Sequence, residues 1–370
     1  LSAGNGNKQI LLMNGLPVFN PRKPDNEKSG QGEIVPLNAL KLLCAFMVAG
    51  IHIPFVGDAY LDPIYRIAVP IFFLISGYFL IDGSGQLGTV RICRALKKSI
   101  LLTIYANIVY YIFNAVIFKI YRYSFWETLV EGGTISTVLW YMTAYIQALA
   151  VVWIFVKLKL SNFLPLLVPI GIFLNLFFGT YYWLTFDDIP TVCFDGGEPN
   201  SLFLSRNFLT VALPCMVLGM WIRVKRLSFS TVKLCIATIL LAVAVYWEKD
   251  MIMSVGEVGL YGDIEFMTIP LSVSVFLLAL NMDGKSQAIR LMGYLGKRHS
   301  VNIYLYHCMM YLILGVMMYH FSVDIPHEYY WKLPVILILI ITFSAFYGTI
   351  KKTINKKLSG NVIADGAGFA

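Results

Sequence analysis

Residues 35–52 read VPLNALKLLCAFMVAGIH, an otherwise apolar segment that holds one lysine, Lys41, and one histidine, His52. Ionisable groups are costly in a membrane helix, so a retained one usually faces a cavity and has a function. Ten residues separate Lys41 from His52, and eleven steps return to nearly the same helix face, roughly 16 Å further along the axis. The segment therefore predicts a membrane helix with a cation near one membrane surface and an imidazole deeper in.

The composition agrees with a membrane protein. Of the 370 residues, 58% are hydrophobic and 14% are charged, and the mean hydropathy is +0.70. Soluble domains are about 45–50% apolar and about 25% charged. Long, continuous apolar runs exclude a β-barrel, whose strands alternate over short stretches. The net charge of +8 could indicate a nucleic-acid partner, but the basic residues gather in alternate loops, so we expect none.

Apolar runs long enough to cross a bilayer predict an all-α integral membrane protein with a bundle of about ten transmembrane helices. These spans lie near 35–57, 65–82, 98–119, 136–157, 162–179, 206–223, 231–247, 266–281, 299–320 and 332–350.

Basic residues concentrate in every other predicted loop, such as 83–98 and 223–233, and acidic residues in the loops between, such as 180–205. The positive-inside rule then places the basic loops and both termini in the cytoplasm. An even number of spans agrees with this orientation. We expect three parts: a cytoplasmic arm over 1–34, one transmembrane domain over 35–351 and a cytoplasmic tail over 352–370.

Two histidines are candidates for chemistry. His52 is a candidate general base, because a neutral imidazole can take a proton near pH 7 and return it. His307 ends the motif Ser300-Val-Asn-Ile-Tyr304-Leu-Tyr-His307, at the start of the ninth predicted span. The alternative is that either histidine is bonded within the bundle for structure alone. We expect no metal ion in the site.

A cluster of four cations follows the second span. Arg91, Arg94, Lys97 and Lys98 fall within eight residues at the predicted cytoplasmic face. They could bind a polyanion, and arginine suits phosphate because its planar fork bonds bidentately. The alternative is a positive-inside anchor that contacts anionic lipid.

Further polar residues lie in and beside the spans. Ser76 and Gly77 are small enough to let two helices approach closely, which is the more common role of such a pair. Ser76 and Tyr78 could also present hydroxyls to a cavity. Arg66 is expected at the outer membrane boundary, where it can snorkel or contact a substrate. Arg206 opens the sixth span at its outer end.

Together these motifs resemble the membrane acyltransferase-3 family, which includes O-acetyltransferases of bacterial surface polysaccharides. The resemblance covers roughly residues 36–350. It rests on the first span ending in His52, FFLISGYFL at 72–80, RICR at 91–94 and IYLYH at 303–307.

The resemblance implies roles for particular residues. It makes His52 the catalytic residue and lets Arg91 and Arg94 help to hold acyl-CoA. The family usually has an arginine where this chain has Lys41, and often an aspartate where it has Asn38. Lysine keeps the charge but loses the bidentate fork.

We therefore expect a membrane O-acyltransferase of the bacterial cytoplasmic membrane, which moves an acyl group, by preference acetyl, from cytoplasmic acyl-CoA to a hydroxyl of a surface glycan or related acceptor. His52 would deprotonate that hydroxyl, and Ser76, Tyr78 or Tyr304 would stabilise the oxyanion. An acyl-histidine intermediate is an alternative route. The donor would bind Lys41, Arg91, Arg94, Lys97 and Lys98, and the acceptor Arg66, Arg206, Tyr304 and His307.

The alternative function is a membrane transporter in which Lys41, His52 and His307 line a path for a small molecule, a glycan or protons. Dependence on acyl-CoA separates the two functions. Uptake into vesicles without acyl-CoA would favour the transporter.

Overall fold

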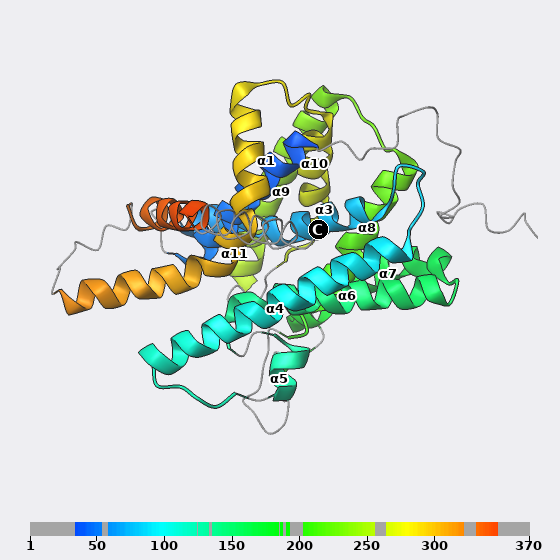
Figure 1. Ribbon diagram of the computed structural model, residues 1–370. Coiled ribbons are helices and arrows are strands. Elements are labelled where there is room, and N and C mark those ends of the chain that lie inside the picture. The colour runs from blue at the N-terminus through cyan, green and yellow to red at the C-terminus, as the bar shows by residue number, and fades with distance from the viewer. Residues whose placement is uncertain are drawn as a thin grey trace, which may run out of the picture. The chain divides into compact units, whose positions relative to one another are not determined.

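The computed structural model describes residues 34–53, 58–123, 125–132, 135–184, 186–187, 190–192, 203–255, 264–321 and 331–346. Over these residues the regular elements are helices, with one isolated β-bridge between Ile81 and Leu87 (Figure 1). The helices form two compact units, which are described separately. Unit 1 contains residues 69–281, and unit 2 contains residues 34–68 together with those from 282 onward.

Eight helices in the described part of the chain are long and apolar enough to cross a membrane, so the prediction of an all-α, multi-pass membrane protein is confirmed. They are Val35–His52, Tyr60–Leu80, Thr89–Ile117, Trp140–Lys157, Ser161–Thr180, Phe208–Lys225, Thr231–Ser254 and Gln287–His320. Two shorter apolar helices, Thr268–Asn281 and Lys332–Phe346, coincide with two further predicted spans. The total of about ten crossings and the cytoplasmic side of both termini stay predictions.

Unit 1 is a set of apolar helices joined by short turns. Its longer helices are α3 (Ala68–Leu80), α4 (Thr89–Ile117), α6 (Trp140–Lys157), α7 (Leu167–Asn175), α8 (Leu213–Lys225), α9 (Thr231–Val255) and α10 (Thr268–Asn281). The shorter elements are α5 (Phe125–Val130), η1 (Thr137–Leu139), η2 (Ser161–Leu166), η3 (Leu176–Thr180), η4 (Tyr182–Leu184) and η5 (Phe208–Ala212).

Two glycines bring α3 and α8 into backbone contact. A Cβ at Gly77 would lie 1.9 Å from the carbonyl oxygen of Met216, and a Cβ at Gly219 would lie 2.0 Å from that of Leu74. Each glycine therefore accommodates the main chain of the other helix. The expectation that Gly77 permits close helix approach is confirmed, and small residues have this function in many membrane bundles.

Unit 2 is built on the packing of α1 (Val35–His52) against α11 (Gln287–His320), with α2 (Asp58–Tyr65) beside α1. Pro36 lies at the start of α1, where its missing N–H leaves no bond unmade. Glycines of α11 allow the close contact, since a Cβ at Gly296 would lie 1.9 Å from the carbonyl oxygen of Asn38. The two ends of α11 run in different directions (Figure 1).

Several predicted boundaries are wrong, as three of the helices show. α1 ends at His52, because Ile53 is extended, whereas the first span was predicted to reach residue 57. α9 continues to Val255 beyond the predicted end at 247, and α11 begins at Gln287 rather than 299. A search for apolar runs finds only the hydrophobic part of a helix, whereas backbone hydrogen bonding continues through polar residues at either end.

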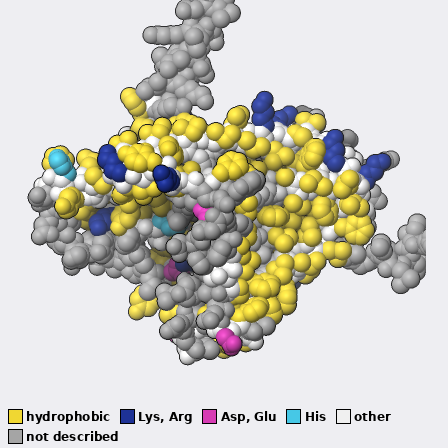
Figure 2. Space-filling view, turned by 90° about the horizontal axis from the view of Figure 1, so that it is seen from below, with side chains coloured by type: hydrophobic (Ala, Val, Ile, Leu, Met, Phe, Trp, Pro, Cys, Tyr) yellow, Lys and Arg dark blue, Asp and Glu magenta, His cyan; other side chains and the backbone are white. Residues whose placement is uncertain are grey.

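The surface is rich in exposed apolar side chains, as Figure 2 shows. On α4, only Ile92, Ser99, Ala106 and Tyr110 are buried. A helix that exposes most of its apolar side chains is unusual in water and ordinary in contact with lipid. Parts of the prediction lie outside the described residues: the arm over 1–33, the tail over 352–370 and residues 193–202 of the long acidic loop.

Candidate active site

Unit 2 brings the two candidate histidines together. The ring centroids of His52 and His307 lie 5.2 Å apart, with an angle of 35° between the ring planes. His52 is the last residue of α1 and is partly buried, whereas His307 lies within α11 and has no exposed surface. The imidazole stands at the end of α1, and its predicted depth in the membrane stays a prediction.

One edge of the His307 ring faces backbone carbonyl groups of its own helix. Its Nδ1 atom lies 2.8 Å from the carbonyl oxygen of Tyr304 and 3.1 Å from that of Ile303. Its Nε2 atom is buried and has no hydrogen-bond partner among the described residues. The ring of Tyr304, itself only 6% exposed, is centred 6.4 Å from the ring of His307. This part of α11 therefore presents a buried nitrogen without a partner.

Lys41 is tied to its own helix. Its Nζ atom donates a hydrogen bond to the Oδ1 atom of Asn38, 3.3 Å away and three residues earlier. Asn38 is 7% exposed. At these two positions the chain departs from the arginine that is usual, and the aspartate that is frequent, in the family that it resembles. Both departures therefore fall on one hydrogen-bonded pair of α1.

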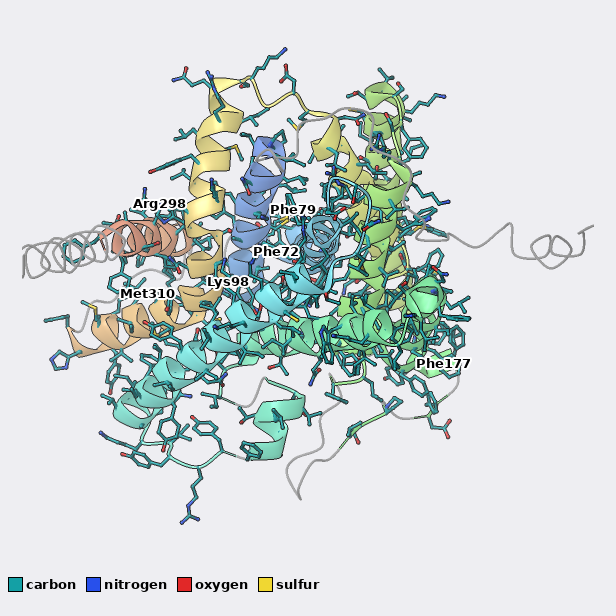
Figure 3. All side chains as sticks on the ribbon, turned by 45° about the vertical axis from the view of Figure 1, so that its right-hand side comes forward. Phe72, Phe79, Lys98, Phe177, Arg298 and Met310 are labelled. Atoms are coloured by element: carbon teal, nitrogen blue, oxygen red, sulfur yellow. The ribbon has the colours of Figure 1, made fainter. Side chains whose placement is uncertain are left out.

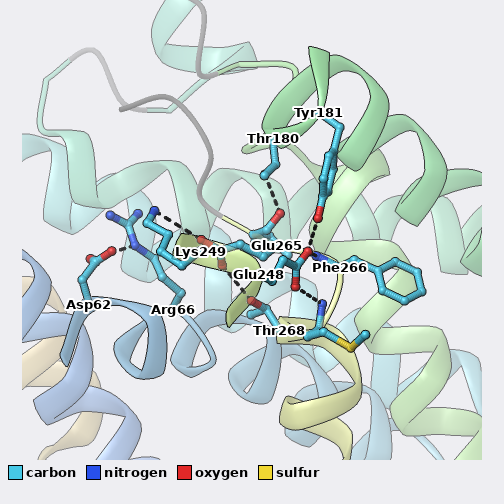
Figure 4. A network of polar contacts seen from close by, with 11 residues as sticks. Asp62, Arg66, Thr180, Tyr181, Glu248, Lys249, Glu265, Phe266 and Thr268 are labelled. Atoms are coloured by element: carbon cyan, nitrogen blue, oxygen red, sulfur yellow. Dashed lines mark hydrogen bonds and ion pairs between the residues drawn. The ribbon is translucent and has the colours of Figure 1, made fainter. Parts of the chain in front are cut away.

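Arg66 follows α2 and forms an ion pair within unit 2. Its Nε atom donates to the Oδ1 atom of Asp62 at 2.9 Å, as drawn in Figure 4. Ion pairs near the surface contribute about 0–1 kcal/mol to stability. This ion pair fixes the direction of the guanidinium, and the expected contact between Arg66 and a substrate stays a prediction.

In unit 1, Tyr78 is engaged by an arginine. The Nη1 atom of Arg223 donates to the Tyr78 hydroxyl at 2.8 Å, and the guanidinium carbon lies 4.9 Å from the centroid of the Tyr78 ring. The hydroxyl accepts this bond and so keeps its own proton for donation. Arg223 was expected only at the edge of the basic loop over 223–233, whereas the structure makes it part of α8.

The Ser76 hydroxyl is used within the bundle. It donates to the carbonyl oxygen of Phe72 at 2.8 Å and is also hydrogen-bonded to Tyr145. Arg206, the other polar candidate of unit 1, lies in the turn before η5 and is partly buried. The expected contact of Ser76 with the oxyanion and the expected contact of Arg206 with the acceptor stay predictions.

The basic cluster occupies the first turns of α4. Arg91 is held back against the preceding turn, with its Nη1 atom 3.4 Å from the carbonyl oxygens of both Phe79 and Ile81. Arg94, Lys97 and Lys98 are exposed, and Figure 3 shows Lys98 on α4. The N-terminus of a helix adds favourable electrostatic potential for an anion. With the partly buried Arg91, these exposed cations form a positively charged helix start without an acidic residue in its first turn.

An acidic turn supports the position of Arg91. The Asp82 carboxylate accepts hydrogen bonds from the backbone N–H groups of Ser84 and Gln86 at 2.9 and 2.8 Å. Burial opposes the shift, but these hydrogen bonds, that of the Ser84 hydroxyl and the charge of Arg91 hold the pKa of Asp82 below its usual value.

A shallow groove runs beside the basic cluster. It has a volume of about 450 Å³ and is lined by apolar side chains with one cation at its edge: Cys93, Leu96, Ile100, Leu101, Trp153 and Lys97.

Unit 1 also contains a buried carboxylate, Glu248, which lies directly after the predicted span over 231–247. It lies in α9 and is 5% exposed. Its oxygens accept a hydrogen bond from the Tyr181 hydroxyl and bonds from the backbone N–H groups of Phe266 and Met267 at 2.6 and 2.8 Å (Figure 4). Burial and the carboxylate charge raise the pKa of Tyr181.

A second buried carboxylate, Glu265, completes this network. It is 1% exposed and accepts from the Nζ atom of Lys249 at 3.3 Å and from the Thr268 hydroxyl at 2.9 Å. The Thr180 hydroxyl donates to the neighbouring carbonyl oxygen of Ile264 at 2.6 Å. The carboxylate oxygens of this network have hydrogen-bond donors, so we interpret the network as structural: it holds the start of α10 in place.

Among the described residues, no group of three or more His, Cys, Asp or Glu side chains could hold a metal ion. The arrangement instead offers a histidine pair in unit 2 and a basic helix start in unit 1.

The sequence pattern of a family described as an acyltransferase domain matches residues 34–350, which include every described helix. No curated protein and no solved structure matches the chain.

Proposed function

Because the chain belongs to the membrane acyltransferase-3 family, we propose that it transfers an acyl group, by preference acetyl, from cytoplasmic acyl-CoA to a hydroxyl of a surface glycan or related membrane-held acceptor. The family match and the eight apolar helices support acyl transfer by a multi-pass membrane protein. The observation that carries the proposal further is the histidine pair, His52 beside His307. The bacterial cytoplasmic membrane is the proposed location.

His52 is the proposed general base. It takes the proton of the acceptor hydroxyl while the hydroxyl oxygen attacks the thioester carbonyl carbon. The tetrahedral intermediate then collapses, the carbon–sulfur bond breaks, and the thiolate of CoA takes the proton from His52. The partly buried position of His52 supports this role, because the ring is reachable and is also shielded from bulk water.

Hydroxyl groups are proposed to stabilise the oxyanion. Tyr78 is one candidate, because its hydroxyl accepts from Arg223 and can donate its own proton toward negative charge. Ser76 has its proton directed to the carbonyl oxygen of Phe72, so it would have to give up that bond. Tyr304 neighbours His307 in α11 and is the third candidate.

The basic start of α4 is the proposed site for the CoA phosphates. Arg91 and Arg94 can bind phosphate bidentately, and the exposed Lys97 and Lys98 add point charges. Lys41 would contribute a further cation roughly 16 Å along α1 from His52, which is a distance that the flexible arm of CoA can span. Arg66 and Arg206 are the proposed acceptor contacts.

The test is acyl transfer by the purified protein. Protein in detergent is mixed with radiolabelled acetyl-CoA and membrane glycans, and both label transfer and release of free CoA are followed. We expect His52→Ala to lose about 10²–10⁴-fold in rate, the usual contribution of a general base. The matched control is His320→Ala, because His320 is an exposed histidine at the end of α11.

An undiminished rate in His52→Ala would exclude the proposed base. Uptake of a solute into vesicles without any acyl donor, together with no CoA release, would indicate a transporter.

A further inference from the structure

The tautomer of His307 follows from its contacts. Carbonyl oxygens only accept hydrogen bonds, so the Nδ1 atom that faces the carbonyls of Ile303 and Tyr304 must carry the proton. In a neutral imidazole the other nitrogen then has a lone pair. The Nε2 atom of His307 is therefore a hydrogen-bond acceptor, buried and without a partner among the described residues.

A buried acceptor without a donor is costly, so a donor is expected to approach it. The His52 ring is the neighbouring polar group, with its centroid 5.2 Å away. At this centroid separation two imidazole rings that are turned edge to edge come within about 3 Å of each other, which is hydrogen-bonding distance. A small rotation of the His52 ring would direct an N–H group at the lone pair of His307.

We propose that His307 is a positioning residue that accepts a hydrogen bond from His52 through Nε2 and takes up its proton during acyl transfer. The inference rests on the proposed function of His52 as the base. Because His307 has no exposed surface, its role is exerted through His52 rather than on the acceptor.

The proton steps balance. One nitrogen of His52 takes the proton of the acceptor hydroxyl, and the other nitrogen passes its own proton to Nε2 of His307. His307 becomes an imidazolium whose Nδ1–H still donates to two carbonyl oxygens. When the CoA thiolate leaves, it takes a proton from His52, and His307 returns its proton to His52.

The charged groups on the surrounding helices are the reason why we assign the uptake of this proton to His307. A catalytic histidine is commonly oriented by a carboxylate, but neither α1 nor α11 contains an aspartate or glutamate. On α2, which packs against α1, Asp62 is paired with Arg66. The remaining ionisable groups of α1 and α11 are cations, histidines, cysteines and tyrosines, of which the charged ones are Lys41, Arg290, Lys297 and Arg298.

The kinetic test uses two variants of His307. In His307→Gln, the amide can still donate to the carbonyls and accept from His52, but it cannot take up a proton. In His307→Leu both functions are lost. We expect both variants to lose about 10²-fold in kcat, with an unchanged KM for acetyl-CoA and an altered pH profile. His320→Gln is the matched control, because His320 is exposed on the same helix.

A wild-type kcat and pH profile in His307→Gln would overturn the proposal. A spectroscopic measurement gives an answer that needs no acyl transfer. In ¹⁵N-histidine NMR of the folded protein, we expect His307 as the Nδ1–H tautomer and a shifted titration of His52 in His307→Gln. An unchanged His52 titration would refute the inference. If the wild-type protein transfers no acyl group, that result refutes the proposed function alone.

Discussion

The amine of Lys41 lies 3.3 Å from the amide oxygen of Asn38, one turn earlier on α1. The family that the chain resembles usually has an arginine and often an aspartate at these positions, whereas this chain has a lysine and a neutral amide. A neutral amide satisfies one N–H of the ammonium without neutralising it.

Lys41→Met is expected to weaken acetyl-CoA binding by about tenfold or more, because it removes one charged hydrogen bond worth about 1.5–3 kcal/mol. Asn38→Asp should also weaken binding, because the new carboxylate neutralises Lys41. Lys41→Arg is the matched control and should bind as the wild type does. Calorimetry on the detergent-purified protein measures all three, and equal affinity in Lys41→Met would remove Lys41 from the donor site.

Arg91→Ala/Arg94→Ala is expected to weaken acetyl-CoA binding by about tenfold or more, since charged hydrogen bonds to phosphate are lost. The binding should also weaken with added salt, because exposed charges are screened. Lys285→Ala is the control, as Lys285 is an exposed cation in a separate loop, with 86% of its side chain accessible. Binding that is unchanged by the two arginine substitutions and by added salt would contradict the proposed phosphate site.

Gly296→Ala is expected to destabilise unit 2 by about 3 kcal/mol or more, or to prevent folding, because overpacking costs up to that amount even in adaptable cores. The new Cβ would lie 1.9 Å from the main-chain oxygen of Asn38, so α1 and α11 would have to separate. Gly315→Ala is the matched control on α11, since a Cβ there meets nothing within 4 Å. Thermal unfolding in detergent compares them, and equal Tm values would show that the helices adjust freely.

Glu248→Ala is expected to cost about 3–5 kcal/mol, because removing a buried charged partner leaves its donors unsatisfied. The Tyr181 hydroxyl and the backbone N–H groups of Phe266 and Met267 would all lose their acceptor. Asp250→Ala is the control, because Asp250 is exposed on the same helix. Urea titration of the two variants measures the difference, and similar midpoints would mean that water replaces the carboxylate.

The Asp82 carboxylate gives a pH dependence with a defined sign. Its pKa in the folded protein is lowered, so its contribution to stability is complete above the unfolded value of about 3.9. That contribution is lost as the pH falls through the lower, folded value. Asp82→Asn should therefore lower Tm slightly at pH 7, and the difference from wild type should vanish in strong acid. A constant difference across the titration would refute the assignment.

Much of the fold could be predicted from local pattern. The apolar runs located the eight long helices, since a span is encoded by consecutive residues and needs no partner. Helix ends were less well predicted, as the extension of α9 past Glu248 shows, because a polar residue can remain helical when its partners come from elsewhere in the chain. The sequence has no signal that Glu248 would be buried.

By itself the sequence determined that this chain is a multi-pass helical membrane protein, and it singled out His52, His307 and the basic start of α4. These properties follow from the composition and from the spacing of residues within short segments of the sequence. Only the tertiary structure decided that His52 faces His307, that Arg223 reaches Tyr78, and that Gly77 and Gly219 accept each other's helix. Such contacts depend on how distant helices pack, which is set by shape and hydrogen bonding across the unit rather than by any one segment.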